Sequence, residues 1–199
     1  VMRIALVHDF LLKLGGAERV LKVLADHFPT APIYTLLYDQ KRVGAVFPKD
    51  RIIYSSAQRF PRFLRHHPRY LLPFLPRAIE GFDFSGFDVV LSSNSAFAHG
   101  IITNTTTHHL CYYHSPMRYA WDWTHRYPQE QNVGAFRSFA MAHLLHRVRQ
   151  CDREAADRVD TPIANSLTVR DRIAKYYRQK AAVRSQSRQW FDIAARRQL

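Results

Sequence analysis

The most constraining feature of this chain is its opening, in which an apolar run leads through a glycine pair into a helical pattern. Residues 2–8 read Met-Arg-Ile-Ala-Leu-Val-His, which has the length and composition of a buried strand. Gly15 and Gly16 follow, and apolar residues then recur at helical spacing from Val20 to Phe28. A strand, a glycine turn and a helix N-terminus together present backbone N–H groups and a positive helix end to an anion. The opening therefore indicates a phosphate-binding turn.

Strand-like and helix-like segments alternate along the rest of the chain. Short apolar runs predict further strands at 33–38, 51–54, 88–92, 109–113 and 161–164, and helical spacing predicts helices at 16–28, about 134–158 and 167–177. Such alternation is typical of a mostly parallel sheet with helices on both faces, which is a Rossmann-like α/β fold. We therefore expect residues 1–178 to form one Rossmann-like domain.

A sheet of this kind binds its ligands at the carboxyl ends of its strands. The residues expected at that edge are His8, Asp9, Gly15, Gly16, Ser92, Ser93 and His114. The glycine turn carries neither the full G-x-G-x-x-G fingerprint nor the Gly-Lys-Ser/Thr of a P-loop. It predicts either a phosphate cradle or an ordinary tight turn in which glycine supplies a positive φ.

The segment 112–123 is dense in side chains that bind sugars and phosphates. His114 comes directly after an expected strand, where an imidazole can hydrogen-bond a hydroxyl group or an oxyanion. Arg118 is suited to a phosphate. The aromatic residues with flat faces and polar tips are Tyr119, Trp121 and Trp123. The alternative is a capped loop with a core histidine and buried rings.

The net charge of +13 implies attraction to something anionic. Residues 170–199 hold nine Lys or Arg and two Asp, and residues 59–77 hold five Arg and no acid. Within 59–77 the arginines alternate with aromatic and aliphatic residues, and four prolines prevent one continuous helix. Charge combined with apolar area suits an anionic bilayer surface. The residues expected to face a membrane are Arg62, Phe63, Arg65 and Arg69; RNA binding and a solvated linker over a satellite core are the alternatives.

Several other classes of protein and site are not expected. No apolar run approaches the roughly 20 residues of a membrane span, and no charged-then-apolar leader precedes the first strand. Cys111 and Cys151 lack metal-ligand spacing, so we expect reduced thiols in the core of a cytosolic protein. The histidine pairs at 66–67 and 108–109 are adjacent residues, which do not share a face, so no metal site is predicted.

Four segments, taken in order, resemble the retaining glycosyltransferases of family 4, which have the GT-B architecture. The similarity is to bacterial mannosyltransferase-like enzymes of polysaccharide assembly, and it covers about residues 2–178. The segments lie within 3–20, 71–93, 113–122 and 164–177. The most specific of them reads His-Ser-Pro-Met-Arg-Tyr from His114 to Tyr119.

The resemblance implies an N-terminal lobe that receives the acceptor and a C-terminal lobe that holds the nucleotide-sugar. Gly15 and Gly16 are expected to approach the donor diphosphate, and His114 is expected near the transferred sugar as the catalytic residue, an orienting or proton-handling group. The residues expected on the acceptor side are Asp9, Arg118, Tyr119 and Asp122. No cofactor or catalytic metal is expected, because positive protein groups and helix dipoles stabilise the leaving diphosphate in such enzymes.

The chain also departs from the family pattern. The second lobe of such enzymes carries two glutamates separated by seven residues. The four glutamates here, which are Glu18, Glu80, Glu130 and Glu154, do not have that spacing. After Val183 the sequence reads as a frameshift, a truncation or a local substitution, and 179–199 forms a basic tail expected to be helical or disordered. The resemblance therefore implies that this chain lacks the donor-binding lobe and has little transferase activity alone.

These observations predict the acceptor-binding half of an enzyme that transfers a hexose to a lipid-linked saccharide in polysaccharide biosynthesis. Mannose from the nucleotide-sugar GDP-mannose is the expected donor, and the inner face of the cytoplasmic membrane is the expected location. A basic nucleic-acid-binding module is one alternative, although no helix-turn-helix, zinc-finger or RNA-binding signature supports it and no nucleic acid is expected. A noncatalytic lobe that acts with a partner chain is another.

Overall fold

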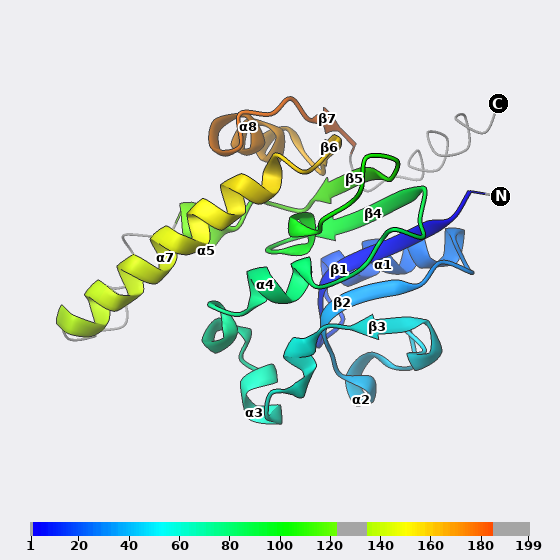
Figure 1. Cartoon of the computed structure of the whole chain (residues 1–199), viewed down its shortest axis with the longest axis horizontal. Coiled ribbons are helices and arrows are strands. Elements are labelled where there is room, and N and C mark those ends of the chain that lie inside the picture. Colours follow the sequence, from blue (N-terminus) through cyan, green and yellow to red (C-terminus); the bar gives the residue numbers. More distant parts are fainter. Residues whose placement is uncertain (1, 123–134, 185–199) are drawn as a thin grey trace.

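The computed structural model describes residues 2–122 and 135–184, and in it one parallel sheet organises the chain (Figure 1). The sheet has seven strands in the order β3-β2-β1-β4-β5-β6-β7. The strands are β1 (Ile4–Leu11), β2 (Ile33–Tyr38), β3 (Ile52–Tyr54), β4 (Val89–Asn94), β5 (His108–Tyr113), β6 (Thr161–Ala164) and β7 (Ala182–Val183). Each neighbouring pair is parallel. The Rossmann-like α/β fold expected from the sequence is confirmed.

Helices fill the connections between these strands. The α-helices are α1 (Gly16–His27), α2 (Gln40–Val43), α3 (Arg62–Arg65), α4 (Leu75–Glu80), α5 (Arg118–Trp121), α7 (Ala135–Ala156) and α8 (Leu167–Tyr176). The short 3-10 turns are η1 (Lys49–Arg51), η2 (Ser56–Arg59), η3 (Pro68–Leu71) and η4 (Ala98–Gly100). The three long helices lie where the sequence predicts them, and the basic stretch between β3 and β4 is broken into short turns, as its prolines require.

The order of the strands creates a switch point in the middle of the sheet. The chain runs outward from β1 through β2 to β3, and then returns to the other side of β1 to form β4. In the resulting register His8 lies opposite Thr35 on one side and Ser93 on the other. The carboxyl ends of β1 and β4 therefore diverge into connections that leave in opposite directions, which is where open α/β sheets bind ligands.

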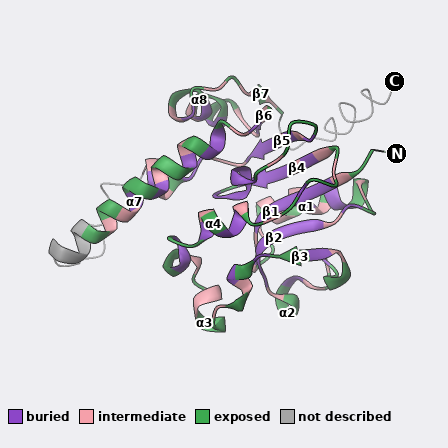
Figure 2. Ribbon diagram, in the orientation of Figure 1, coloured by how far each residue is buried: buried purple, intermediate pink, exposed green. Residues whose placement is uncertain are grey.

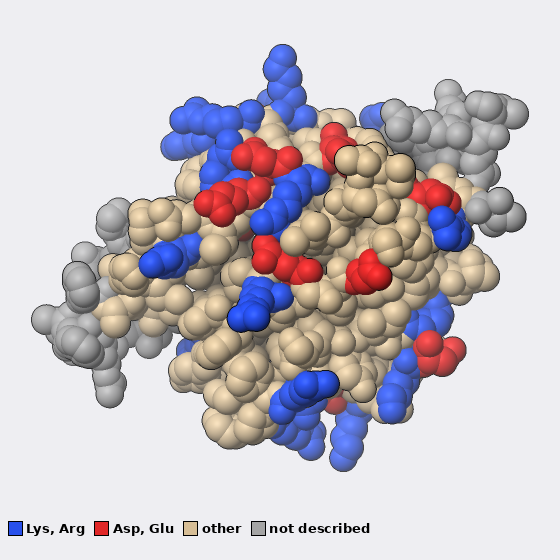
Figure 3. Space-filling model, viewed as in Figure 1, with Lys and Arg blue, Asp and Glu red and all other residues tan. Residues whose placement is uncertain are grey.

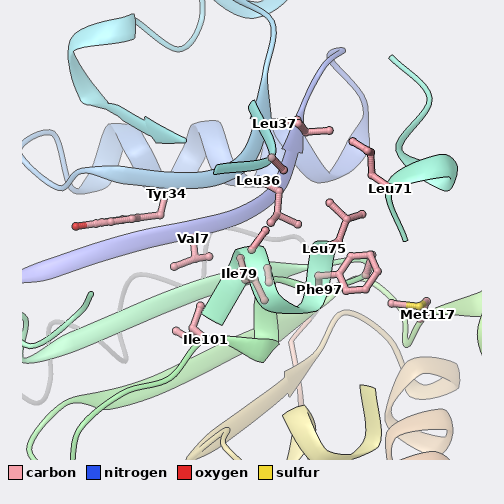
Figure 4. Packing of buried hydrophobic residues seen from close by; sticks show 14 of the residues in the cluster. Val7, Tyr34, Leu36, Leu37, Leu71, Leu75, Ile79, Phe97, Ile101 and Met117 are labelled. Atoms are coloured by element: carbon pink, nitrogen blue, oxygen red, sulfur yellow. The ribbon is translucent and has the colours of Figure 1, made fainter. Parts of the chain in front are cut away.

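Successive residues of β1 supply the two faces of the sheet. Leu6 and Leu11 pack with the helix α1 and with Phe47 on one face. Ala5 and Val7 join a larger cluster on the other face, under α4 and η4. Figure 4 shows part of this cluster, in which side chains of the sheet meet those of α4 and its neighbours. Figure 2 shows that the central strands are almost wholly buried, whereas α2 and α3 carry much exposed surface.

Two expectations about the C-terminal part are corrected. The sheet continues past residue 178, since β7 pairs with β6 inside the segment that the sequence assigns to a basic tail; residues 185–199 and Trp123 lie outside the described residues. The helix α7 presents Val148 and Asp152 to the interior, while Cys151 is exposed and only Cys111 is a core thiol. The expectation that Cys151 is buried was wrong because the helix turns the neighbouring residue inward.

Over residues 2–122 and 135–184, the helices are too short or too polar to cross a lipid bilayer.

Candidate functional site

Asp9 ties the carboxyl end of β1 to the loop that follows β4. Its side chain is 2% exposed. Oδ1 accepts the backbone N–H groups of Phe97 and Ala98 at 2.6 and 2.7 Å. Oδ2 accepts those of Ser95 and Ala96 at 2.5 and 3.0 Å. Because a carboxylate has about four lone-pair sites, this loop uses its full capacity. Asp9 therefore shapes the edge of the sheet. Both of its carboxylate oxygens are occupied, so neither is open for the predicted contact with an acceptor.

Ser93 bridges two histidines beside Asp9. Its hydroxyl Oγ lies 3.1 Å from Nδ1 of His8 and 2.9 Å from Nε2 of His114. The carbonyl oxygen of Ser93 also lies 3.1 Å from Nδ1 of His8. A carbonyl oxygen can only accept, so His8 carries a proton on Nδ1, and the hydroxyl accepts from it. The same hydroxyl is hydrogen-bonded to Nε2 of His114, so the bridge fixes the orientation of both rings.

His114 is held in its neutral form. Its pKa is lowered to about 4, chiefly by burial and also by the neighbouring His8, while Asp9 and Glu18 act in the opposite direction. A group with this pKa rarely holds a proton near neutral pH and is a weak general base. Of the two roles expected for His114, this environment favours the orientation of a hydroxyl group over proton transfer.

The glycine turn at the start of α1 is filled from within the chain. The carboxylate of Glu18 accepts the N–H of Gly15 at 2.8 Å, and its other oxygen lies 3.8 Å from Nε2 of His8. Burial raises the pKa of Glu18, but His8 and the backbone N–H groups outweigh it and bring the pKa below its ordinary value. The turn therefore already holds one negative charge at Gly15. Space remains at Gly16, where an added Cβ meets nothing within 4 Å.

The sequence also allowed an ordinary tight turn in which Gly15 and Gly16 supply a positive φ, and that explanation was wrong. Gly15 has a φ of −122°, and among the glycines that the structure describes there is no positive φ. The pair is therefore not required by a left-handed turn. An added Cβ at Gly16 would also meet no other group of the described chain, so contacts within the chain do not require glycine there either.

The residues expected on the acceptor side fall into two places. Tyr119 is half-buried and lines a hollow at the sheet edge, and Arg118 is exposed on the same short helix, α5. Asp122 instead accepts the hydroxyl of Tyr176 at 2.5 Å and lies 3.2 Å from a guanidinium nitrogen of Arg172. Asp122 thus joins α5 to α8, away from the switch point.

Three adjoining hollows follow the carboxyl edge of the sheet. The central hollow, of about 320 Å³, is lined by both acidic and basic side chains, including His8, Glu18, Lys13 and Arg42. An apolar hollow of about 360 Å³ shares Phe10 and Pro68 with it. On the other side a basic hollow of about 320 Å³ shares Leu12 and His66. The structure therefore brings the first turn of α1, His8 and part of the basic stretch to one crevice, whereas His114, Gly15 and Gly16 are not among the residues that line these three hollows.

The basic stretch contributes directly to this crevice. Arg62 and Arg65 line the basic hollow, and Arg69 lines the apolar hollow. Phe63 is 67% exposed. Of the four residues expected to face a membrane, Arg62, Phe63 and Arg69 are exposed, and Arg65 is only partly so.

A second buried carboxylate, that of Asp152, was not predicted from the sequence. Its Oδ2 accepts the indole N–H of Trp121 at 2.6 Å and the hydroxyl of Tyr177 at 2.8 Å, and its Oδ1 lies 3.4 Å from Nε2 of His99. Burial raises the pKa of Asp152, against the lowering effect of these three partners. The signal was present, because Asp152 falls on the apolar stripe of its helix, between Val148 and Ala155.

Within the described ranges, His, Cys, Asp and Glu side chains do not gather in groups of three or more that could hold a metal ion. A scan against protein-family models gives no match to this chain, and a search of curated proteins gives no significant match. The fold and the edge crevice define a Rossmann-like α/β domain, and any finer assignment rests on the chemistry of the site.

Because His114 is neutral in the folded chain, the free energy of unfolding should fall as the pH is lowered. The ordinary pKa of 6.5 applies to the unfolded chain and about 4 to the folded one, so protons bind the unfolded chain more tightly between these values. The contribution of His114 is complete above about pH 6.5 and is lost as the pH falls towards 4. In urea titrations, His114→Gln should reduce the loss of unfolding free energy between about pH 7 and about pH 5 by about 1–2 kcal/mol.

His108→Gln is the matched control, because His108 lies at the opposite end of the same strand. The acid-induced loss of unfolding free energy should be reduced less in His108→Gln than in His114→Gln. An identical loss on acidification in the wild type and in His114→Gln would contradict the assignment of a neutral His114.

Proposed function

We propose that this chain is the acceptor-binding lobe of a retaining hexosyltransferase that uses a nucleotide-sugar donor and a lipid-linked saccharide acceptor. Mannose from GDP-mannose is the expected case, on the sequence resemblance. The observation that carries the proposal is the bridge from His8 through Ser93 to His114 at the switch point. It holds the neutral imidazole of His114 against Ser93, and Ser93 also contacts His8, which lines the central hollow.

In this proposal His114 orients a sugar hydroxyl at the reacting centre. Ser93 is hydrogen-bonded to Nε2 of His114, so the ring cannot rotate without breaking that hydrogen bond. A hydroxyl held by a fixed partner loses less orientational freedom in the transition state, which is how positioning lowers a barrier. In the reaction the bond between the sugar carbon and the leaving diphosphate breaks, a bond from that carbon to the acceptor oxygen forms on the same face, and the proton of the acceptor hydroxyl passes to the leaving diphosphate.

The diphosphate approaches the open side of the glycine turn. Gly16 leaves room there for a phosphate oxygen, and the positive end of α1 favours negative charge. Glu18 already neutralises part of the positive charge at the N-terminus of α1, because it accepts the N–H of Gly15, so further cations are needed to bind a diphosphate. Lys13 and Arg42 line the central hollow together with Glu18 and supply this positive charge.

The basic stretch places the lobe against an anionic membrane surface. The exposed apolar residues are Phe63, Tyr70 and Phe74, with 67%, 57% and 53% of their surfaces accessible. Arg59, Arg62 and Arg77 are exposed among them. Figure 3 shows Lys and Arg gathered at two ends of the face it draws, over α8 and around α2 and α3, with acidic side chains between them. Charge and apolar area together are what peripheral binding requires.

Saccharide binding tests the site. The purified chain should bind mannosyl citronellyl diphosphate in isothermal titration calorimetry, and His114→Ala should weaken that binding by about tenfold, because one oriented hydrogen bond is lost. His108→Ala, at the other end of β5, should bind like the wild type.

Equal effects of the two histidine variants would contradict the proposed site. If the phosphosugar does not bind while a single-stranded oligonucleotide binds with strong salt dependence, the chain is a nucleic-acid-binding module instead.

Vesicle binding tests the membrane surface. Arg62→Gln combined with Phe63→Ser should reduce co-sedimentation with phosphatidylglycerol vesicles, since both a charge and an apolar side chain are lost. The matched control is Lys175→Gln with Leu167→Ser on α8, where Leu167 is 59% exposed. The wild-type binding should weaken as salt is added.

Equal losses of vesicle binding in the two double variants would contradict a membrane role for α3. Vesicle binding that depends on neither salt nor lipid charge would also contradict it.

A further inference from the structure

We propose that the apolar hollow binds the hydrocarbon chain of an anionic amphiphile, whose phosphate lies in the central hollow. The inference rests on the proposed function, because it gives the lipid part of the acceptor its binding site. Three observations carry it: the composition of the apolar hollow, its continuity with the central hollow, and the cations along both.

The apolar hollow is built from several parts of the chain. Its apolar walls include Phe10 from β1, Leu72 from the turn before α4, Leu75 from the start of α4, Phe97 from the loop after β4, and Leu145 from α7. Figure 4 shows Leu75 and Phe97 lying next to each other, with Met117 close by. The volume of about 360 Å³ lies within the range of about 300–1,000 Å³ for small-molecule sites.

The apolar hollow leads directly into the polar one. Phe10 and Pro68 line both. Phe10 follows Asp9, whose hold on the loop after β4 fixes both the backbone at Phe10 and the neighbouring Phe97. A ligand that fills both hollows therefore needs an apolar part joined to a polar head.

The charges along this path favour an anionic head. Asp9 is saturated by four backbone N–H groups, and Glu18 is engaged by Gly15 and His8. Lys13 and Arg42 line the central hollow and are exposed to an incoming ligand.

Arg69 lies at the rim of the apolar hollow, where it is exposed. Its guanidinium carbon lies 4.9 Å from the centre of the Tyr70 ring, and its Nη2 donates to the hydroxyl of Tyr70 at 3.0 Å. Tyr70 lines the hollow and is 57% exposed, so it connects the hollow with the exposed aromatic surface of the basic stretch. A lipid chain can pass from a bilayer at that surface into the hollow.

Alkyl phosphates test this inference without any sugar. The chain should bind hexyl, octyl and decyl phosphate as monomers, with affinity rising about threefold to fourfold for each added methylene, since each buried methylene gives a constant increment of free energy. Decyl phosphate should bind more tightly than decanol, and inorganic phosphate should bind weakly. Titration calorimetry below the micelle concentration measures all of these.

Two matched pairs of variants locate the site. Met141→Asp places a carboxylate on the wall of the hollow and should weaken decyl phosphate binding at least tenfold, whereas Ala142→Asp, on the exposed side of α7, should not. Arg42→Gln, in the central hollow, should weaken decyl phosphate more than decanol, and Arg170→Gln, on α8 and outside both hollows, should leave both unchanged. Thermal unfolding checks that each variant is folded, and Tyr70→Ser, at an exposed rim position, replaces Met141→Asp if that variant is not.

The outcomes separate this inference from the proposed function. Affinity that does not change with chain length, or equal losses in Met141→Asp and Ala142→Asp, would overturn the hydrocarbon site even if mannosyl citronellyl diphosphate still binds. Alkyl phosphate binding that behaves as expected, without any effect of His114→Ala on saccharide binding, would keep the hydrocarbon site and remove the transferase proposal. Met141→Asp should also leave phosphatidylglycerol vesicle binding unchanged; a parallel loss there would place the lipid on the outer surface and contradict the hollow.

Discussion

The carboxylate of Asp9, with its four backbone N–H partners, is the interaction on which the edge of the sheet depends. Hydrogen bonds to an ionised acceptor are stronger than neutral ones, and here they join two chain segments far apart in the sequence. Asp9 stands between His8, which reaches Ser93, and Phe10, which lines two of the three hollows. One buried charge thus positions both the polar and the apolar parts of the crevice.

A second buried carboxylate, that of Asp152, also joins separate segments of the chain. Asp152 gathers Trp121, Tyr177 and His99, and so joins α5, α7, α8 and η4. Between these two anchors lies His114, which burial keeps neutral. Glu18 keeps its charge although it is partly buried, because it caps its own helix and faces His8. The carboxyl edge of the sheet therefore combines a neutral imidazole, a carboxylate held by its own helix and exposed cations.

The fold was largely predictable, and the roles within the site were not. The strand at 33–38 was found with its predicted bounds because all six of its residues are buried, and strands covered on both faces read as continuous apolar runs. The edge that carries His8, Gly16 and His114 follows from parallel strands alone. The bridge through Ser93 depends on the register between β1 and β4, which no local pattern encodes. Nor does a sequence reveal whether a carboxylate such as Asp9 faces a ligand or backbone N–H groups. Cys151 was misplaced because a one-residue difference on a helix turns a side chain by about 100°.

Amide hydrogen exchange of Asp9→Asn tests most directly whether Asp9 organises the carboxyl edge of the sheet. Replacing the carboxylate with an amide leaves buried N–H groups without acceptors, so the free energy of unfolding should fall by about 2–3 kcal/mol. Exchange should accelerate at residues 95–98 more than at β6 or α8. Asp26→Asn, which changes a carboxylate that is 61% exposed, should do neither. Unchanged protection of 95–98 and a stability within about 0.5 kcal/mol of the wild type would contradict the claim.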